Sequence, residues 1–143
     1  MKKLTFLIGR WSGNATTRRG PNETVNVKQS EEVQFKLDGL VLLIEGTGRN
    51  PETGNAMFDA LATVSYDDTA NVYRFRAYND GRYLDTELKV PENGFEWGYQ
   101  AGPAYVRFTM RLNEKGEWVE TGDVKAGDNP RQRTFEMTLQ KQN

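Results

Sequence analysis

The sequence predicts an all-β protein, an antiparallel up-and-down β-barrel of about ten strands with a short N-terminal plug. Three observations support this. Apolar and polar residues alternate along most of the chain, as in strands with one buried face. Turn sequences interrupt the alternation at even spacing, and no segment after the first few residues has a helical period. A flat sheet of that many strands would leave two exposed edges, which closure into a barrel removes.

The N-terminal stretch combines an apolar run with a Gly-x-Trp-x-Gly step. Residues 4–8 hold large apolar side chains, and burying each recovers roughly 1.5–3 kcal/mol, so the run needs a partner. Gly9 allows a tight turn or a close backbone approach, Trp11 is a large apolar anchor, and Gly13 allows the following strand to bend. We therefore expect a plug followed by the first strand of a closed sheet.

The remaining strands follow from alternation and turn signals. Asp38-Gly39 and Asp80-Gly81 are strong hairpin turns. In the second strand, Gln29 and Glu31 fall on the apolar face, which indicates either a bulge or a polar group that points inward. The expected strands are 11–19, 24–37, 41–49, 57–66, 72–78, 82–90, 95–99, 104–113, 117–125 and 133–140.

Composition excludes several classes of function. The 143 residues fit one domain, residues 1–143, without a linker or repeat. Nineteen basic and 20 acidic residues give a net charge of −1, so we expect no nucleic-acid or membrane partner. The chain has no cysteine and no histidine, which removes thiolate chemistry and the commonest general base and metal ligand. We expect no metal and no cofactor.

The first residues resemble a signal peptide only briefly. Met1-Lys2-Lys3 precedes an apolar run that is too short, and Arg10 interrupts it before any cleavage site. We expect a soluble, cytoplasmic protein, and the sequence leaves open an export signal removed before residue 1.

Several stretches resemble a known group. Gly9-x-Trp11-x-Gly13 at the entry to a barrel is similar to the calycins, which include lipocalins, fatty-acid-binding proteins and nitrobindin-like barrels. With residues 37–39, 120–122 and 135–139, the chain resembles the lipocalin-like bacterial proteins grouped as the DUF1579 family. The resemblance implies a barrel with a cavity and no established activity.

The resemblance also has implications for individual residues. In calycins the motif tryptophan packs under a basic residue of the last strand, and we expect Arg133, rather than Arg131, to cover Trp11. Nitrobindin-like barrels bind haem through histidine, which this chain lacks, so no haem site is carried over.

Two groups of polar residues are candidates for binding. Arg76 and Tyr78 share one face of a strand and are similar to the carboxylate-binding Arg-x-Tyr of fatty-acid-binding barrels. If Phe75 faces the core, however, Arg76 faces water. Glu45 is the one charge in an apolar strand, and it faces either an inward arginine or the solvent. Glu87, which shares a strand face with Asp85, is a second candidate base.

Aromatic residues are candidates for a cavity wall. Small-molecule pockets are commonly lined by amphipathic rings, and the chain offers a set of them: Trp97, Tyr99, Tyr105 and Trp118. The alternative is that these rings are ordinary core.

The favoured function is binding of one small, largely apolar or amphipathic ligand with an acidic end, which Arg76 and Tyr78 would anchor. One alternative is an enzyme, an isomerase or hydrolase, that uses Glu45 or Glu87 as base. Another is a filled barrel that acts through its surface, for example as a homodimer.

Overall fold

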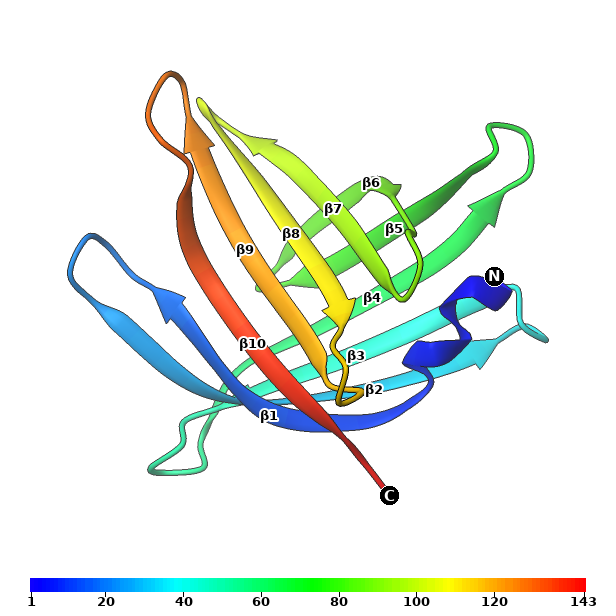
Figure 1. The fold of residues 1–143 in the computed structure, drawn as a ribbon, viewed down its shortest axis with the longest axis horizontal. Coiled ribbons are helices and arrows are strands. Elements are labelled where there is room, and N and C mark those ends of the chain that lie inside the picture. Colours follow the sequence, from blue (N-terminus) through cyan, green and yellow to red (C-terminus); the bar gives the residue numbers. More distant parts are fainter.

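The computed structural model describes residues 1–143, and ten strands form one antiparallel sheet in which neighbours in sequence pair with each other (Figure 1). β1 also pairs with β10, so the two ends of the chain meet. The predicted all-β up-and-down barrel is confirmed. The strands are β1 (Gly9–Arg18), β2 (Thr24–Lys36), β3 (Val41–Arg49), β4 (Ala56–Asp67), β5 (Val72–Asn79), β6 (Arg82–Leu88), β7 (Gly94–Ala101), β8 (Ala104–Leu112), β9 (Trp118–Ala126) and β10 (Gln132–Gln142).

The barrel is nearly closed. β6 and β7 are the two ends of the sheet and lie next to each other, joined by the single antiparallel bridge between Lys89 and Glu96. We call this junction the seam. All other neighbouring strands are paired along most of their length, so the seam is where the barrel has the fewest interstrand hydrogen bonds.

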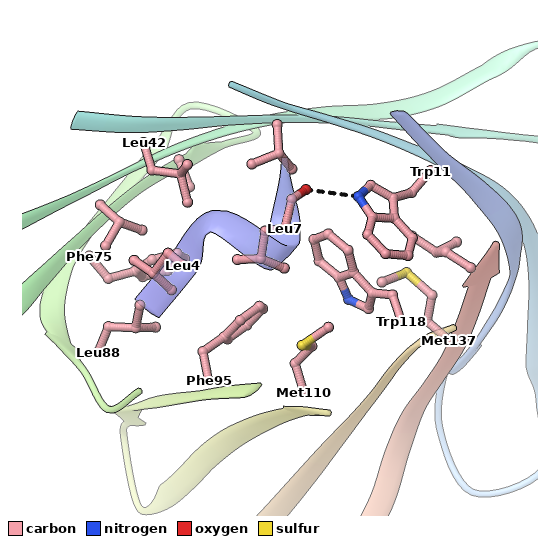
Figure 2. Close-up of a cluster of buried hydrophobic side chains, with 14 of the residues drawn as sticks. Leu4, Leu7, Trp11, Leu42, Phe75, Leu88, Phe95, Met110, Trp118 and Met137 are labelled. Atoms are coloured by element: carbon pink, nitrogen blue, oxygen red, sulfur yellow. Dashed lines mark hydrogen bonds between the residues drawn. The ribbon is translucent and has the colours of Figure 1, made fainter. Parts of the chain in front are cut away.

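The predicted N-terminal plug is present as a short 3₁₀ helix, η1 (Lys2–Leu7). Leu4 and Leu7 are 0% and 1% exposed, and Figure 2 shows them among core side chains of the surrounding strands. The indole Nε1 of Trp11 donates a hydrogen bond of 2.9 Å to the carbonyl oxygen of Leu7 (Figure 2). This bond satisfies a buried donor and fixes the helix to the start of β1.

The core lies at the end of the barrel that η1 fills, which we call the plugged end. Trp11 and Trp118 meet edge to face, with ring centroids 5.5 Å apart, and Phe95 meets Trp118 in the same way at 5.9 Å. The opposite end, which we call the open end, carries no plug, and the inward-facing side chains there are less deeply buried.

The basic residue over Trp11 is Lys141, which corrects the expectation for Arg133. Lys141 pairs directly with Trp11 across β10 and β1, and its Nζ lies 5.3 Å from the ring centroid. Arg133 lies at the other end of β10, where its Nε donates to Oδ1 of Asp123 at 2.7 Å. Gly13 has the close approach expected of it, because a Cβ there would collide with the backbone of Thr138 and Leu139.

No helix in the structure is both long and apolar enough to cross a membrane.

Candidate functional site

Three polar side chains face the interior of the barrel, and we call them the acceptor site: Gln29 and Glu31 on β2, and Glu120 on β9. The inward face of β2 also carries Val27 and Val33, which are buried, so the strand continues without a bulge through the two polar positions. Of the two interpretations open for Gln29 and Glu31, the structure therefore supports the inward-pointing one.

Each carboxyl group of the acceptor site accepts one hydrogen bond from a neighbour. Gln29 Nε2 donates to Glu31 Oε1 at 2.9 Å, and Trp118 Nε1 donates to Glu120 Oε1 at 3.0 Å. The side-chain oxygen of Gln29 has no partner, although the residue is only 4% exposed. A buried acceptor without a donor is costly, so this oxygen needs a donor such as a water molecule, a protonated carboxyl group or a ligand.

Burial changes the acidity of both carboxyl groups. It raises the pKa of Glu31 from 4.5 to about 8, with a smaller upward contribution from the charge of Glu120 and an opposing one from the Gln29 hydrogen bond. It raises the pKa of Glu120 from 4.5 to about 7, opposed by the Trp118 hydrogen bond. Both side chains are only partly buried by exposed area, so they keep access to the interior while losing most of their hydration.

A glycine provides the room for Glu31. Gly46 on β3 pairs with Glu31, and a Cβ at Gly46 would lie 2.7 Å from Oε2 and 2.8 Å from Oε1 of that carboxyl group. Such distances are too short for a carbon atom and an oxygen atom that are not bonded. The carboxyl group therefore occupies the space that a side chain would fill.

Aromatic side chains line the interior on the open side of Glu120. Gly122 lies two residues after Glu120 on the same face of β9, and Phe108 and Phe135 flank it from the neighbouring strands. Trp97 stacks on Phe108 with centroids 4.6 Å apart, and Tyr99 continues the stack at 6.1 Å from Trp97. We call these four rings the aromatic wall: Trp97, Tyr99, Phe108 and Phe135.

The structure places two of the three predicted wall residues in the interior. Trp97 and Tyr99 share the inward face of β7 with buried Phe95, and both remain partly exposed. Tyr105 is on the outer face of β8, 42% exposed, and its hydroxyl group lies over Gly98. The reason is the register, because Val106 rather than Tyr105 shares its face of β8 with buried Met110.

The structure places Arg76 and Tyr78 on the outer face of β5, because Phe75 points into the core and its neighbours in sequence alternate with it. Arg76 Nε donates to Asp85 Oδ2 at 3.1 Å, and the arginine side chain is 55% exposed. Tyr78 packs against Tyr83 with centroids 5.3 Å apart. The structure therefore does not bring Arg76 and Tyr78 into the barrel, and the solvent-facing interpretation applies.

Glu45 and Glu87 are also on the outer face. Glu45 is exposed on β3, whereas its neighbour Ile44 faces inward opposite Val33. Glu45 lines a shallow hollow on the outer surface, and Tyr78 lines the same hollow. Glu87 is exposed on β6 and pairs across the strands with Arg74. Neither carboxyl group faces the interior.

Glu120 is not among the site residues predicted from the sequence. It shares its strand face with buried Trp118 and Gly122, so its parity gives the same signal that Gln29 and Glu31 gave. Its proximity to Glu31 depends on the curvature of the whole sheet.

Comparisons with known proteins agree with the fold. No protein-family model matches the sequence, and neither does a curated protein. Among solved structures, the chain is similar to Rv2717c from M. tuberculosis, with a TM-score of 0.73 and 12% identity, over 99% of this chain and 96% of that one. At this identity the likeness shows the barrel fold alone. Membership of the DUF1579 family stays a prediction.

Proposed function

We propose that the barrel binds one small, largely apolar or amphipathic molecule, which enters through the open end. The observation that carries this proposal is the unpartnered, buried oxygen of Gln29, in a barrel whose inward aromatic wall is still partly exposed. Small-molecule sites commonly combine apolar walls with a few convergent polar groups. The wall would hold the apolar body of the ligand, and the acceptor site would meet its polar end. Arg76 and Tyr78 are not part of this proposal.

The first test is native mass spectrometry of the protein purified from its own host without detergent or lipid. We expect an adduct of defined mass in the wild type. Trp97→Ala, which shortens the aromatic wall, should lose most of the adduct. Tyr83→Ala removes an aromatic ring from the outer face, where it is 57% exposed, and should retain the adduct.

A mass without an adduct, together with a dimeric mass in solution, would favour the alternative of a barrel that acts through its surface. Equal retention of the adduct in Trp97→Ala and the wild type would place the ligand elsewhere on the molecule.

A second candidate is an enzyme on the same barrel, and the acceptor site favours it through its two inward carboxyl groups. Burial raises the pKa of Glu31 to about 8 and that of Glu120 to about 7, the range that suits a general acid and base at neutral pH. The test is incubation of the recovered ligand with the protein in D₂O, followed by NMR. Turnover or C–H exchange that Glu120→Gln removes would support proton transfer, and an unchanged ligand would contradict it.

A further inference from the structure

With Glu31 and Glu120 ionised, the acceptor site offers three free hydrogen-bond acceptors, and the second N–H of the Gln29 amide is its one remaining donor. The Nε2 group of Gln29 is directed to Glu31 Oε1, and Trp118 Nε1 is directed to Glu120 Oε1. What remains is the unpartnered Gln29 oxygen and the second oxygen, Oε2, of each carboxyl group. Three acceptors, on β2 and on β9, are thus left for a ligand.

No positive charge in the chain balances these carboxyl groups. No lysine or arginine is buried. Each of the seven ion pairs in the structure joins an arginine to a carboxylate other than Glu31 and Glu120. A buried carboxylate without a cation is strongly disfavoured, and a cation brought by a ligand would relieve that cost.

The residues that face the two carboxyl groups from neighbouring strands do not titrate in the neutral range. Glu31 has Trp11 of β1 and Gly46 of β3 on either side of it. Glu120 has Met110 of β8 and Met137 of β10 on either side of it. Beyond Trp11, the exposed Lys141 places its Nζ 5.3 Å from the indole centroid, and it makes no ion pair with either carboxyl group.

We propose that the ligand of this barrel is an amphipathic amine whose protonated ammonium group is held by Gln29, Glu31 and Glu120. This inference rests on the proposed binding function and names the chemical class of its ligand. A primary ammonium group carries three N–H donors and no acceptor, which matches the three free acceptors. The apolar body of the amine would lie against the aromatic wall, whose ring faces also attract cations.

The same arrangement selects against other polar ends. With Glu31 and Glu120 ionised, a carboxylate would be repelled by both and would find one amide N–H of Gln29 as its donor, so its desolvation would be poorly compensated. An alcohol brings one donor and no charge, so it can satisfy one acceptor only. The expected order of affinity is therefore amine, then alcohol, then carboxylate.

The experiment uses three probes with the same chain length, octylammonium chloride, octanol and sodium octanoate, titrated into the protein by calorimetry at pH 9, where Glu31 and Glu120 are ionised and the amine is still protonated. Because hydrogen bonds to charged groups contribute about 1.5–3 kcal/mol, octylammonium should bind about tenfold to a hundredfold more tightly than octanol. Octanoate should bind most weakly.

Two isosteric variants test the residues. Glu31→Gln and Glu120→Gln remove one charge each without changing the side-chain volume, and each should weaken octylammonium binding by at least about tenfold while changing octanol binding little. Glu45→Gln, on the outer face, is the matched control and should bind octylammonium as the wild type does.

The outcomes separate this inference from the proposed function. Octanol or octanoate binding as tightly as octylammonium would overturn the amine assignment and leave a ligand-binding barrel in place. Loss of octanol binding in Trp97→Ala would confirm that the interior is still the site in that case. Absence of binding for all three probes would overturn both proposals.

Discussion

Glu120 lies between two methionines of the neighbouring strands, Met110 and Met137. Burial there disfavours the ionised carboxylate, so it raises the pKa of Glu120 from 4.5 to about 7. Glu31 behaves in the same way, with a pKa of about 8. In the neutral range the folded protein therefore holds protons that the unfolded chain has released. The contribution of these groups to stability is full below pH 4.5 and is lost as the pH rises through about 7 and 8.

Glu120→Gln should flatten this pH dependence. The variant cannot ionise at this position, so between pH 5 and pH 9 it should avoid about 2–3 kcal/mol of the loss of stability that the wild type shows. Urea denaturation across this range measures the effect, and Glu45→Gln should follow the wild-type curve. Hydrogen bonds lower the pKa values of Asp67 and Glu117, so these two residues affect the pH dependence of stability only at lower pH. Parallel curves for Glu120→Gln and the wild type would contradict the prediction.

Gly46→Ala should disturb the acceptor site through a steric clash with Glu31. The added methyl group would lie within 3 Å of both oxygens of Glu31, so that carboxyl group must move away from Gln29. We expect a loss of stability of about 1–3 kcal/mol, typical of overpacking. Thr47→Ala, at the next position of β3 and on its outer face, is the control. A Gly46→Ala protein as stable as the wild type would show that Glu31 is held loosely.

At this scale the sequence predicts orientation better than proximity. Alternation along one strand was enough to put Gln29 and Glu31 on the apolar face, and to state that Arg76 faces water if Phe75 faces the core. The interaction between Glu31 and Glu120 could not be predicted in this way. Glu120 is far from Glu31 in the sequence, and only the curvature of the sheet brings their charges close enough to interact.

At the level of elements, η1 depends on the barrel that it plugs and would not be stable as an independent helix. It has six residues, no side-chain cap and no charged residue at the favourable end, so its own propensity is weak. Its stability comes from Leu4 and Leu7 packed inside the barrel and from the hydrogen bond that Trp11 donates to Leu7.

Leu4→Ala should therefore destabilise the protein by about 2–5 kcal/mol, the range for removing a fully buried leucine side chain. Thr5→Ala changes an exposed residue of the same helix and should have little effect. Chemical denaturation of both variants compares them directly. Similar stabilities for the two variants would mean that the plug contributes little to the fold.

The strands themselves were predicted well, because alternation and turn residues are local signals, and the expected boundaries differ from the observed ones by one or two residues for most strands. The partner of Trp11 was wrong, because it depends on the register between β1 and β10. That register pairs Trp11 with Lys141 and leaves Arg133 eight residues away. No local pattern fixes how two strands at opposite ends of a chain are aligned.

In the molecule as a whole, backbone pairing is interrupted at one place, the seam between β6 and β7. One bridge and one side-chain hydrogen bond, from Thr86 Oγ1 to the carbonyl oxygen of Gly98, join these strands, so most of their backbone amide groups on that side lack the partner that closure of a barrel normally supplies. Local opening can therefore occur at the seam without unfolding elsewhere.

Amide hydrogen exchange should reveal the seam. Peptides from β6 and β7 should exchange faster than peptides from β3, which is paired along both sides. Mass spectrometry of the exchanged protein measures this difference. Equal protection in β3, β6 and β7 would show that the seam is held by side chains as firmly as by a hydrogen-bonded ladder.

The pairing of β1 with β10 determines when the molecule can finish folding on the ribosome. The strand partner of Trp11 is Lys141, so the second edge of β1 stays uncovered until β10 has been synthesised. During that time the leucines of η1 lack the walls that Phe95, Met110 and Trp118 will provide. Contacts this distant in sequence slow folding and expose apolar segments, so the nascent chain is the form of this protein most in need of a chaperone.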